Sequence, residues 1–294
     1  MKPVALITGA AGLIGGYLAR SAPRWVPGWE VRGVTRAEVD LTDRAQVQRL
    51  WNHHRPNLVL HCAALSRTGL CEQDPAQARL INVEATRVLA TLARDVPFVF
   101  LSTDQVFDGA KGCYVETDVL RPLNVYGKTK AEAEQVVLGN PAHAVVRIAL
   151  TAGTSPTRDR SFVEDMMRAA AKGNKLTLFT DEFRCPMPAG ALVRALWEFG
   201  VQRRSGVYHL GGQERLSRWE IGELLAVRFP ELRSAIQPGS VVGYQGPPRP
   251  PDLSMCSDKM QALLSFRLPG LRQWLSDGSS VGADPWDYPH QESR

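Results

Sequence analysis

The sequence lacks paired cysteines and long apolar runs. Its 294 residues include five cysteines, an odd number, and no two of them form a CxxC pair. Thiols used in this way are typical of a reducing compartment and not of a disulfide framework. No apolar stretch reaches the roughly 20 residues that a transmembrane helix needs. We therefore expect a cytoplasmic protein with no membrane partner.

Clusters of like charge and of metal-ligating side chains are also missing. The net charge is +5, and arginine outnumbers lysine 28 to 7, but no basic run is longer than Arg203-Arg204. A nucleic-acid-binding protein would gather its cations into a stripe or a tail, so we expect no nucleic-acid partner. No carboxylate is spaced to join His53 and His54 in a metal site, and we expect none.

The first half of the chain alternates short apolar runs with helical patterns. The intervening helices are clearest at residues 12–20, 44–51 and 76–94, and one more follows Pro122. Strands are predicted at residues 4–8, 31–35, 58–62, 97–101 and 144–148. Near-continuous apolar strands separated by helices indicate a parallel sheet that is covered on both faces. We predict a doubly wound α/β Rossmann domain over residues 1–150.

The alternation is less regular after about residue 150. Further helices and strands are predicted at residues 162–172, 176–179, 189–199, 206–210 and 218–228. We predict a smaller mixed α/β substrate-binding region over residues 151–276 that partly returns to the main sheet. A polar tail follows at residues 277–294.

A glycine-rich turn follows the first predicted strand. It reads Gly9-Ala-Ala-Gly12-Leu13-Ile14-Gly15, and the helix begins inside it. Backbone N–H groups at a helix N-terminus bind a nucleotide pyrophosphate, and side chains there would hold the ligand away. The GxxGxxG spacing at the start of a βαβ series therefore predicts a dinucleotide site. The alternative is a tight strand-to-helix turn that binds nothing.

The end of the second predicted strand bears on the identity of the dinucleotide. An acid at this position accepts hydrogen bonds from the ribose of NAD, whereas an arginine accommodates the 2′-phosphate of NADP. Here the strand ends at Arg36, and no acid occurs before Glu38. Arg36 therefore favours NADPH, while Glu38 or Asp40 leaves NADH open.

Tyr126 and Lys130 are four residues apart and so share one face of a predicted helix. Reducing a carbonyl requires a proton donor at the oxygen on which negative charge develops. A phenol has an ordinary pKa of about 10, and a nearby ammonium lowers it. The spacing predicts that Tyr126 donates the proton and that Lys130 lowers its pKa, although YxxxK also arises by chance in many helices.

Two hydroxyl residues follow the strand predicted at 97–101. Ser102 and Thr103 lie at the carboxyl edge of the sheet, where doubly wound folds bind their ligands. A hydroxyl at this edge can hydrogen-bond a substrate carbonyl and orient Tyr126, and we assign this role to Thr103. For Ser102 we expect a turn or a helix cap instead.

Taken in order, these motifs resemble the extended short-chain dehydrogenase/reductase family, and within it the dTDP-4-dehydrorhamnose reductases most of all. The stretches that carry the resemblance are DLTD (40–43), HCAA (61–64), STDQVFDG (102–109), RPLNVYGKTK (121–130) and VYHLGG (207–212). The resemblance implies that NADPH passes a hydride to C4 of a nucleotide-linked 4-keto-6-deoxy sugar.

The resemblance also implies roles for individual residues. Thr103, Tyr126 and Lys130 would be catalytic, and Lys130 would also hold the nicotinamide ribose. Asp104, Gln105 and Leu150 would border the sugar. Cofactor contacts would come from Gly9, Gly12, Leu13, Ile14, Gly15, Arg36, Asp40, Leu41, Cys62, Ala63, Ala64, Tyr126 and Lys130.

Several positions near the expected substrate depart from the family pattern. Gln105 and Leu65 replace tyrosines, Gly69 replaces an aspartate, and Leu150 replaces a tryptophan. Hydride chemistry is therefore better supported than the particular sugar. The alternatives are another nucleotide-sugar reductase or epimerase, and an NADP-binding regulatory subunit such as the beta subunit of methionine adenosyltransferase. A homodimer is compatible with the sequence, which leaves the oligomeric state open.

Overall fold

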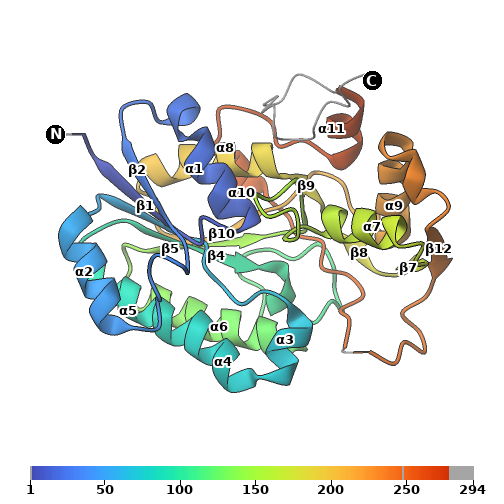
Figure 1. Ribbon diagram of the computed structural model, residues 1–294, viewed down its shortest axis with the longest axis horizontal. Coiled ribbons are helices and arrows are strands. Elements are labelled where there is room, and N and C mark those ends of the chain that lie inside the picture. The colour runs from blue at the N-terminus through green and yellow to red at the C-terminus, as the bar shows by residue number, and fades with distance from the viewer. Residues whose placement is uncertain (1, 247, 278–294) are drawn as a thin grey trace.

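A parallel sheet of six strands forms the centre of the protein (Figure 1), whose computed structural model describes residues 2–246 and 248–277. The strand order is β10-β5-β4-β3-β1-β2. The strands are β1 (Val4–Thr8), β2 (Glu30–Val34), β3 (Leu58–His61), β4 (Phe98–Thr103), β5 (Ala144–Ile148) and β10 (Gly206–Leu210). The order reverses between β1 and β3, and ligands bind at such a point in doubly wound sheets. The predicted fold class is confirmed.

Helices cover both faces of this sheet (Figure 1). On one face lie α1 (Leu13–Trp25) and α8 (Ala189–Val201), and on the other lie α2 (Arg44–His54), α5 (Ala85–Leu92) and α6 (Val125–Leu138). Side chains alternate between the two faces along each strand. In β1, for example, Ala5 and Ile7 pack against the first pair of helices, whereas Leu6 packs against the other three.

The helix predicted over residues 76–94 is divided. It consists of α4 (Pro75–Arg79), a π-helical turn (Leu80–Glu84) and α5. The buried Asn82 lies in the π-helical turn and bonds outside it. Its Oδ1 accepts from the Leu65 N–H at 2.8 Å, and its Nδ2 donates to the Thr129 hydroxyl at 2.9 Å. The wider turn thus connects the segment after β3 to α6.

The C-terminal half builds a second, smaller core beside the sheet. Its members include α7 (Phe162–Ala171), β7 (Leu176–Phe179) and α9 (Arg218–Arg228). The other short elements of this half are β6 (Thr151–Ala152), β8 (Phe183–Arg184), β9 (Met187–Pro188), β11 (Leu216–Ser217), β12 (Ile236–Gly239), α10 (Asp258–Gln261) and α11 (Leu271–Asp277), while α3 (Thr68–Gln73) belongs to the N-terminal half. The main sheet also takes its edge strand, β10, from this half. The predicted tail falls outside the described residues beyond position 277.

Within the described residues, no helix is both long and apolar enough to cross a membrane.

A buried ion pair joins α6 to β5 beneath the carboxyl edge of the sheet. The side chains of Arg147 and Glu134 are 4% and 1% exposed, and Arg147 Nη2 lies 2.8 Å from Glu134 Oε2. The same carboxylate accepts from the Ser102 hydroxyl at 2.5 Å. The expectation for Ser102 is therefore wrong. Its hydroxyl caps no turn, because Ser102 lies inside β4 and donates its hydrogen bond to Glu134.

Replacing Arg147 by methionine is expected to lower the free energy of unfolding by about 3–5 kcal/mol, because Glu134 would remain buried without its partner. Urea denaturation measures the change. Arg94→Met is the control, since the pair of Arg94 with Asp95 is exposed and its loss should cost less than about 0.5 kcal/mol. Equal losses in the two variants would contradict the account.

Candidate active site

The glycine turn lets three segments of backbone approach one another closely. Gly9 has a φ of +74°, and a Cβ added there would lie 2.9 Å from the Ala63 backbone. A Cβ on Gly15 would lie 2.4 Å from the Gly9 carbonyl oxygen. The N-cap of α1 is Gly12, and no described side chain caps the helix. The first N–H groups of α1 are therefore exposed to an anion at the carboxyl end of β1.

The hydroxyl of Thr8 fixes the turn that follows β3. It accepts hydrogen bonds from the backbone N–H groups of Cys62 at 3.2 Å and Ala63 at 3.1 Å. It also lies 2.7 Å from Nδ1 of His61. Residues 62–64, which the sequence predicted to line the cofactor, are thus held against the glycine turn from below.

The tautomer of His61 follows from its partners. The Thr86 hydroxyl donates to the Asn82 carbonyl at 2.7 Å, so it accepts from Nε2 of His61, 2.9 Å away. Nδ1 is then the acceptor of the Thr8 hydroxyl. Burial lowers the pKa of His61 to about 3, and the charge of Lys130 adds to this effect. The ring is therefore neutral, which agrees with a structural histidine.

Arg36 follows β2 and is exposed. The neighbouring Glu38 is already engaged, because it accepts from the Thr35 N–H at 2.9 Å and pairs with Arg32 at 2.8 Å. Asp40 accepts from the Thr42 hydroxyl and N–H, which lower its pKa, and Arg36 lowers it further. Both carboxylates are thus engaged by other groups. Arg36 has no ion pair with a described residue, so its positive charge can meet a phosphate.

Tyr126 is brought to Thr103 by a close contact at the start of α6. A Cβ on Gly127 would lie 2.2 Å from the Gln105 carbonyl oxygen. The N-cap of α6, Asn124, accepts from the Gly127 N–H at 2.8 Å and donates to the Gln105 side chain at 3.0 Å. The first turn of α6 is thereby pressed onto the segment that follows β4.

Thr103 and Tyr126 are buried and interact with each other. Burial raises the pKa of Tyr126, a hydrogen bond with Thr103 lowers it, and Asp104 and Cys71 raise it. Thr103 also accepts from the Gln105 N–H at 3.3 Å and so caps the short 3-10 turn Asp104–Val106. The Thr103 hydroxyl therefore both caps this turn and contacts Tyr126.

Lys130 is 2% exposed, and its Nζ lies 3.8 Å from the centroid of the Phe100 ring. Burial lowers the pKa of Lys130 to about 7, while Glu134 and Cys62 act in the opposite direction. The ammonium thus faces Phe100 and Cys62, whereas Tyr126 is influenced by Asp104 and Cys71. That Lys130 lowers the pKa of Tyr126 stays a prediction.

The predicted substrate residues extend from the sheet edge towards the C-terminal core. Asp104 is buried and lies 3.1 Å from the Thr103 hydroxyl. Burial raises the pKa of Asp104 to about 6, and Arg184 partly opposes this. Gln105 is partly buried beside Asn124, and Leu150 packs on the C-terminal core.

Sequence reasoning missed Asn82 and Glu134, which hold the site from behind. Asn82 ties the segment after β3 to Thr129 of α6, and Glu134 lies one helical turn beyond Lys130. The available signal was a polar residue on the buried face of an otherwise apolar helix. Such residues are buried with partners because an unpaired polar group is costly.

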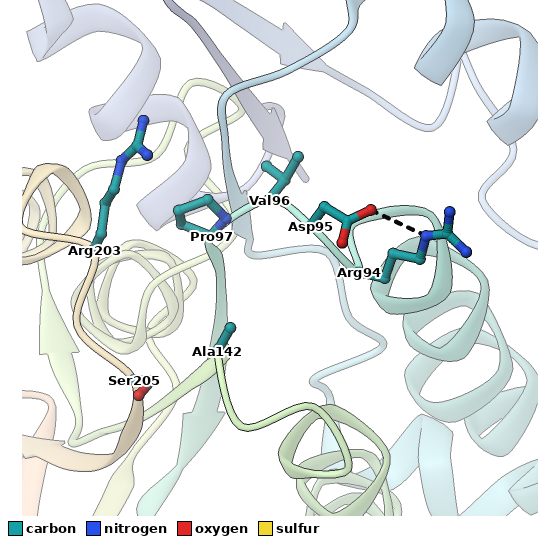
Figure 2. A pocket seen from close by; sticks show the side chains of 7 residues that line it. All are labelled: Arg94, Asp95, Val96, Pro97, Ala142, Arg203 and Ser205. Carbon is teal, nitrogen blue, oxygen red and sulfur yellow. Dashed lines mark hydrogen bonds and ion pairs between the residues drawn. The ribbon is translucent and has the colours of Figure 1, made fainter.

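The structure also has a hollow that none of the predicted site residues lines. A hollow of about 440 Å³ lies at the opposite end of β4 and β5 (Figure 2) and is lined by Arg94, Asp95, Val96, Pro97, Ala142, Arg203 and Ser205. In residues 2–246 and 248–277, no three His, Cys, Asp or Glu side chains form a group that could hold a metal ion.

Comparison with known proteins identifies the family. Residues 1–279 match the family described as the RmlD substrate binding domain. The chain belongs to this family. It is an extended short-chain dehydrogenase/reductase that resembles dTDP-4-dehydrorhamnose reductase, as the motifs predicted.

Two relatives illustrate the range of the family. Methionine adenosyltransferase 2 subunit beta of Xenopus laevis is 32% identical over 291 residues, which cover 92% of this chain and 86% of that protein. The dTDP-4-dehydrorhamnose reductase of Aggregatibacter actinomycetemcomitans is 31% identical over 225 residues, 73% of this chain and 75% of that protein.

Solved structures of the same fold agree with these relatives. A dTDP-4-dehydrorhamnose reductase of Clostridium acetobutylicum has a TM-score of 0.83 at 26% identity, covering 93% of this chain and 97% of that one. The Bacillus anthracis enzyme in complex with NADP has a TM-score of 0.85 at 23% identity, with coverages of 94% and 98%.

His61 is expected to stay neutral and protonated on Nε2 between pH 8 and pH 5, because its pKa in the folded protein is about 3. Two-bond ¹H–¹⁵N NMR correlations report both the tautomer and the titration. Since the unfolded chain binds this proton near pH 6.5, His61 should also make the fold less stable as the pH falls below that value. Protonation of His61 near pH 6.5, or a proton on Nδ1, would refute the assignment.

Proposed function

We propose that this protein is an NADPH-dependent reductase of a nucleotide-linked 4-keto-6-deoxy sugar. The observation that supports this best is that Tyr126 interacts with Thr103 at the end of β4, while Lys130 interacts with Cys62, whose neighbour Ala63 lies against Gly9 of the glycine turn. Relatives named dTDP-4-dehydrorhamnose reductase and dTDP-4-keto-6-deoxy-D-glucose reductase match it at 31% and 33% identity.

The glycine turn fits a dinucleotide. Gly9 and Gly15 leave space that a Cβ would fill, and the N–H groups at the start of α1 face a pyrophosphate. Residues 62–64 would run along the nicotinamide half, and Asp40 and Leu41 along the adenine half. Arg36 would meet the 2′-phosphate of NADPH. NAD in a complex of the same fold, at 25% identity, leaves NADH as a second cofactor.

The catalytic residues supply a proton, its orientation and a positive charge. Bound NADPH supplies the hydride. Tyr126 keeps its proton at neutral pH because burial raises its pKa, so it is ready to donate to an oxygen that gains negative charge. Thr103 can donate a hydrogen bond to the same oxygen, and Lys130 holds the ribose and stabilises the phenolate that remains.

A regulatory subunit is the second candidate. The similarity to methionine adenosyltransferase 2 subunit beta extends over 92% of the chain, more than the 73% matched by the reductase of Aggregatibacter. Such a protein would keep the cofactor cleft without turnover. Retention of Thr103, Tyr126 and Lys130 together supports the enzyme. Cytoplasmic location, a homodimer and the absence of a nucleic-acid partner stay predictions, as does the choice of sugar.

Tyr126→Phe is expected to lower kcat by at least about 100-fold, because the proton donor is lost, while NADPH affinity stays within about twofold. Loss of NADPH absorbance in the presence of dTDP-4-keto-6-deoxy sugars measures the rate, and fluorescence titration measures cofactor binding. The control is Tyr208→Phe, which removes a phenolic hydroxyl from a ring that packs against Phe199 in the core beside the sheet. If wild type binds NADPH but turns over no nucleotide sugar, the regulatory reading replaces the enzyme.

Arg36→Ala is expected to weaken NADPH binding by about tenfold or more and to leave NADH binding nearly unchanged, because only NADPH carries the 2′-phosphate. Dissociation constants for the two cofactors measure the change. Arg32→Ala, which removes a nearby arginine already paired with Glu38, is the control. An unchanged ratio of the two constants in Arg36→Ala would show that Arg36 does not select the cofactor.

A further inference from the structure

Three buried polar side chains form a chain of hydrogen bonds at the end of β4. The Thr103 hydroxyl donates to Oδ1 of Asp104 at 3.1 Å, and Tyr126 forms a hydrogen bond with Thr103. Each of the three side chains is less than a tenth exposed. Buried polar groups take their hydrogen bonds from their neighbours, so the direction of each proton in this chain depends on the other members.

The Thr103 hydroxyl is fully used when Asp104 is ionised. A hydroxyl has one proton and two lone pairs, and a carboxylate only accepts. The Thr103 proton therefore goes to Asp104. One lone pair of Thr103 accepts from the Gln105 N–H at 3.3 Å, and the other accepts from the Tyr126 phenol. In this state the protons of Thr103 and Tyr126 both point into the chain and away from a substrate.

A proton on Asp104 reverses the direction of the chain. The protonated carboxyl becomes a donor, and its partner in this chain is the Thr103 oxygen. The two lone pairs of Thr103 are then used by Asp104 and by the Gln105 N–H. The Thr103 proton and the Tyr126 proton must each find another acceptor. A carbonyl oxygen placed between the two hydroxyls has two lone pairs and can accept from both.

The groups around Asp104 bring its titration close to neutral pH. Burial raises the pKa of Asp104 to about 6, while Arg184 opposes this rise and Glu182 adds to it. Arg184 is itself paired with Glu182 at 2.8 Å, which limits its effect on Asp104. The other ionisable groups that interact with the charge of Asp104 are Tyr126, Cys185 and Arg218.

We propose that Asp104 is a positioning residue whose protonation turns the Thr103 and Tyr126 protons towards the carbonyl oxygen of the substrate. The proposal rests on the proposed function and adds a residue that acts through Thr103. During reduction the O–H bond of Tyr126 breaks, a new O–H bond forms at the sugar oxygen, and Asp104 keeps its own proton. Water returns a proton to Tyr126 after the product has left.

Asp104→Asn tests this role, because its amide N–H also donates to the Thr103 oxygen and so imitates the protonated carboxyl. The measured quantity is kcat/KM for a dTDP-4-keto-6-deoxy sugar at saturating NADPH. We expect the ratio of variant to wild type to rise about tenfold between about pH 7 and pH 8, because the protonated fraction of Asp104 falls by that factor in wild type alone. The titration of Lys130 is common to both proteins and cancels in the ratio.

Asp95→Asn is the matched control. Asp95 is an exposed acid just before the opposite end of β4. The ratio of kcat/KM between this variant and wild type should stay the same at every pH.

Carboxyl ¹³C NMR of aspartate-labelled protein without substrate tests the hydrogen-bond chain independently of turnover. The signal that is missing from Asp104→Asn identifies Asp104, and in wild type it should titrate near pH 6. Thr103→Val removes the hydroxyl that lowers this pKa, so the titration should move to a higher pH. NADPH titration of each variant checks that the glycine turn is intact.

Three results would overturn the proposal. One is an Asp104→Asn ratio that does not change with pH, which would make Asp104 a substrate contact or a structural residue. Another is an Asp104 signal that titrates close to the ordinary aspartate value of about 3.9. The third is a titration of Asp104 that Thr103→Val leaves unchanged.

Failure of this proposal is separable from failure of the proposed function. A wild type that reduces the sugar while the Asp104→Asn ratio is independent of pH refutes only the role of Asp104. A wild type that binds NADPH and reduces no nucleotide sugar refutes the reductase, and with it any catalytic use of the chain, even where Asp104 titrates near pH 6.

Discussion

Contact between stretches of backbone, with no side chain between them, sets the geometry on which the rest of this structure depends. A Cβ at Gly9 would meet the Ala63 backbone, and one at Gly127 would meet the Gln105 carbonyl. The first contact holds the turn after β1 against the turn after β3, and the second holds the start of α6 against the end of β4. The glycine turn and the first turn of α6 are thus each positioned by close backbone packing.

Behind this backbone frame, neutral and charged groups are buried in separate networks. The Thr8, His61 and Thr86 side chains form a neutral chain of hydrogen bonds below the cofactor turn. Glu134 and Arg147 form a charged one beneath Lys130. Burial lowers the pKa of Lys130 to about 7. The nearby Glu134 carboxylate acts in the opposite direction and favours the protonated form of Lys130. Lys130 can therefore keep a positive charge although its side chain is 2% exposed.

The sequence predicted the fold, and offered the motifs of the proposed site, because those features are local. Hydrophobic periodicity located β5, β7, β10 and α9 at their observed bounds, and YxxxK and the glycine spacing are read within one turn. What escaped prediction depends on long-range contacts. Asn82 lies in a π-helical turn and bonds to Leu65 and Thr129. The Ser102 hydroxyl, inside β4, donates to Glu134 of α6. Arg184 and Arg249 meet at Glu182 only through the pairing of distant segments.

The central claim is that the glycine turn, Thr103, Tyr126 and Lys130 form one site, in which a hydride passes from NADPH to C4 of a nucleotide-linked keto sugar. The most direct measurement uses NADPH that carries deuterium at C4 of its nicotinamide ring and follows the deuterium into the sugar by mass spectrometry. We expect wild type to incorporate one deuterium at C4 of the reduced sugar, and Tyr126→Phe to incorporate almost none at matched cofactor occupancy. Unlabelled product, or equal labelling by the two proteins, would contradict it.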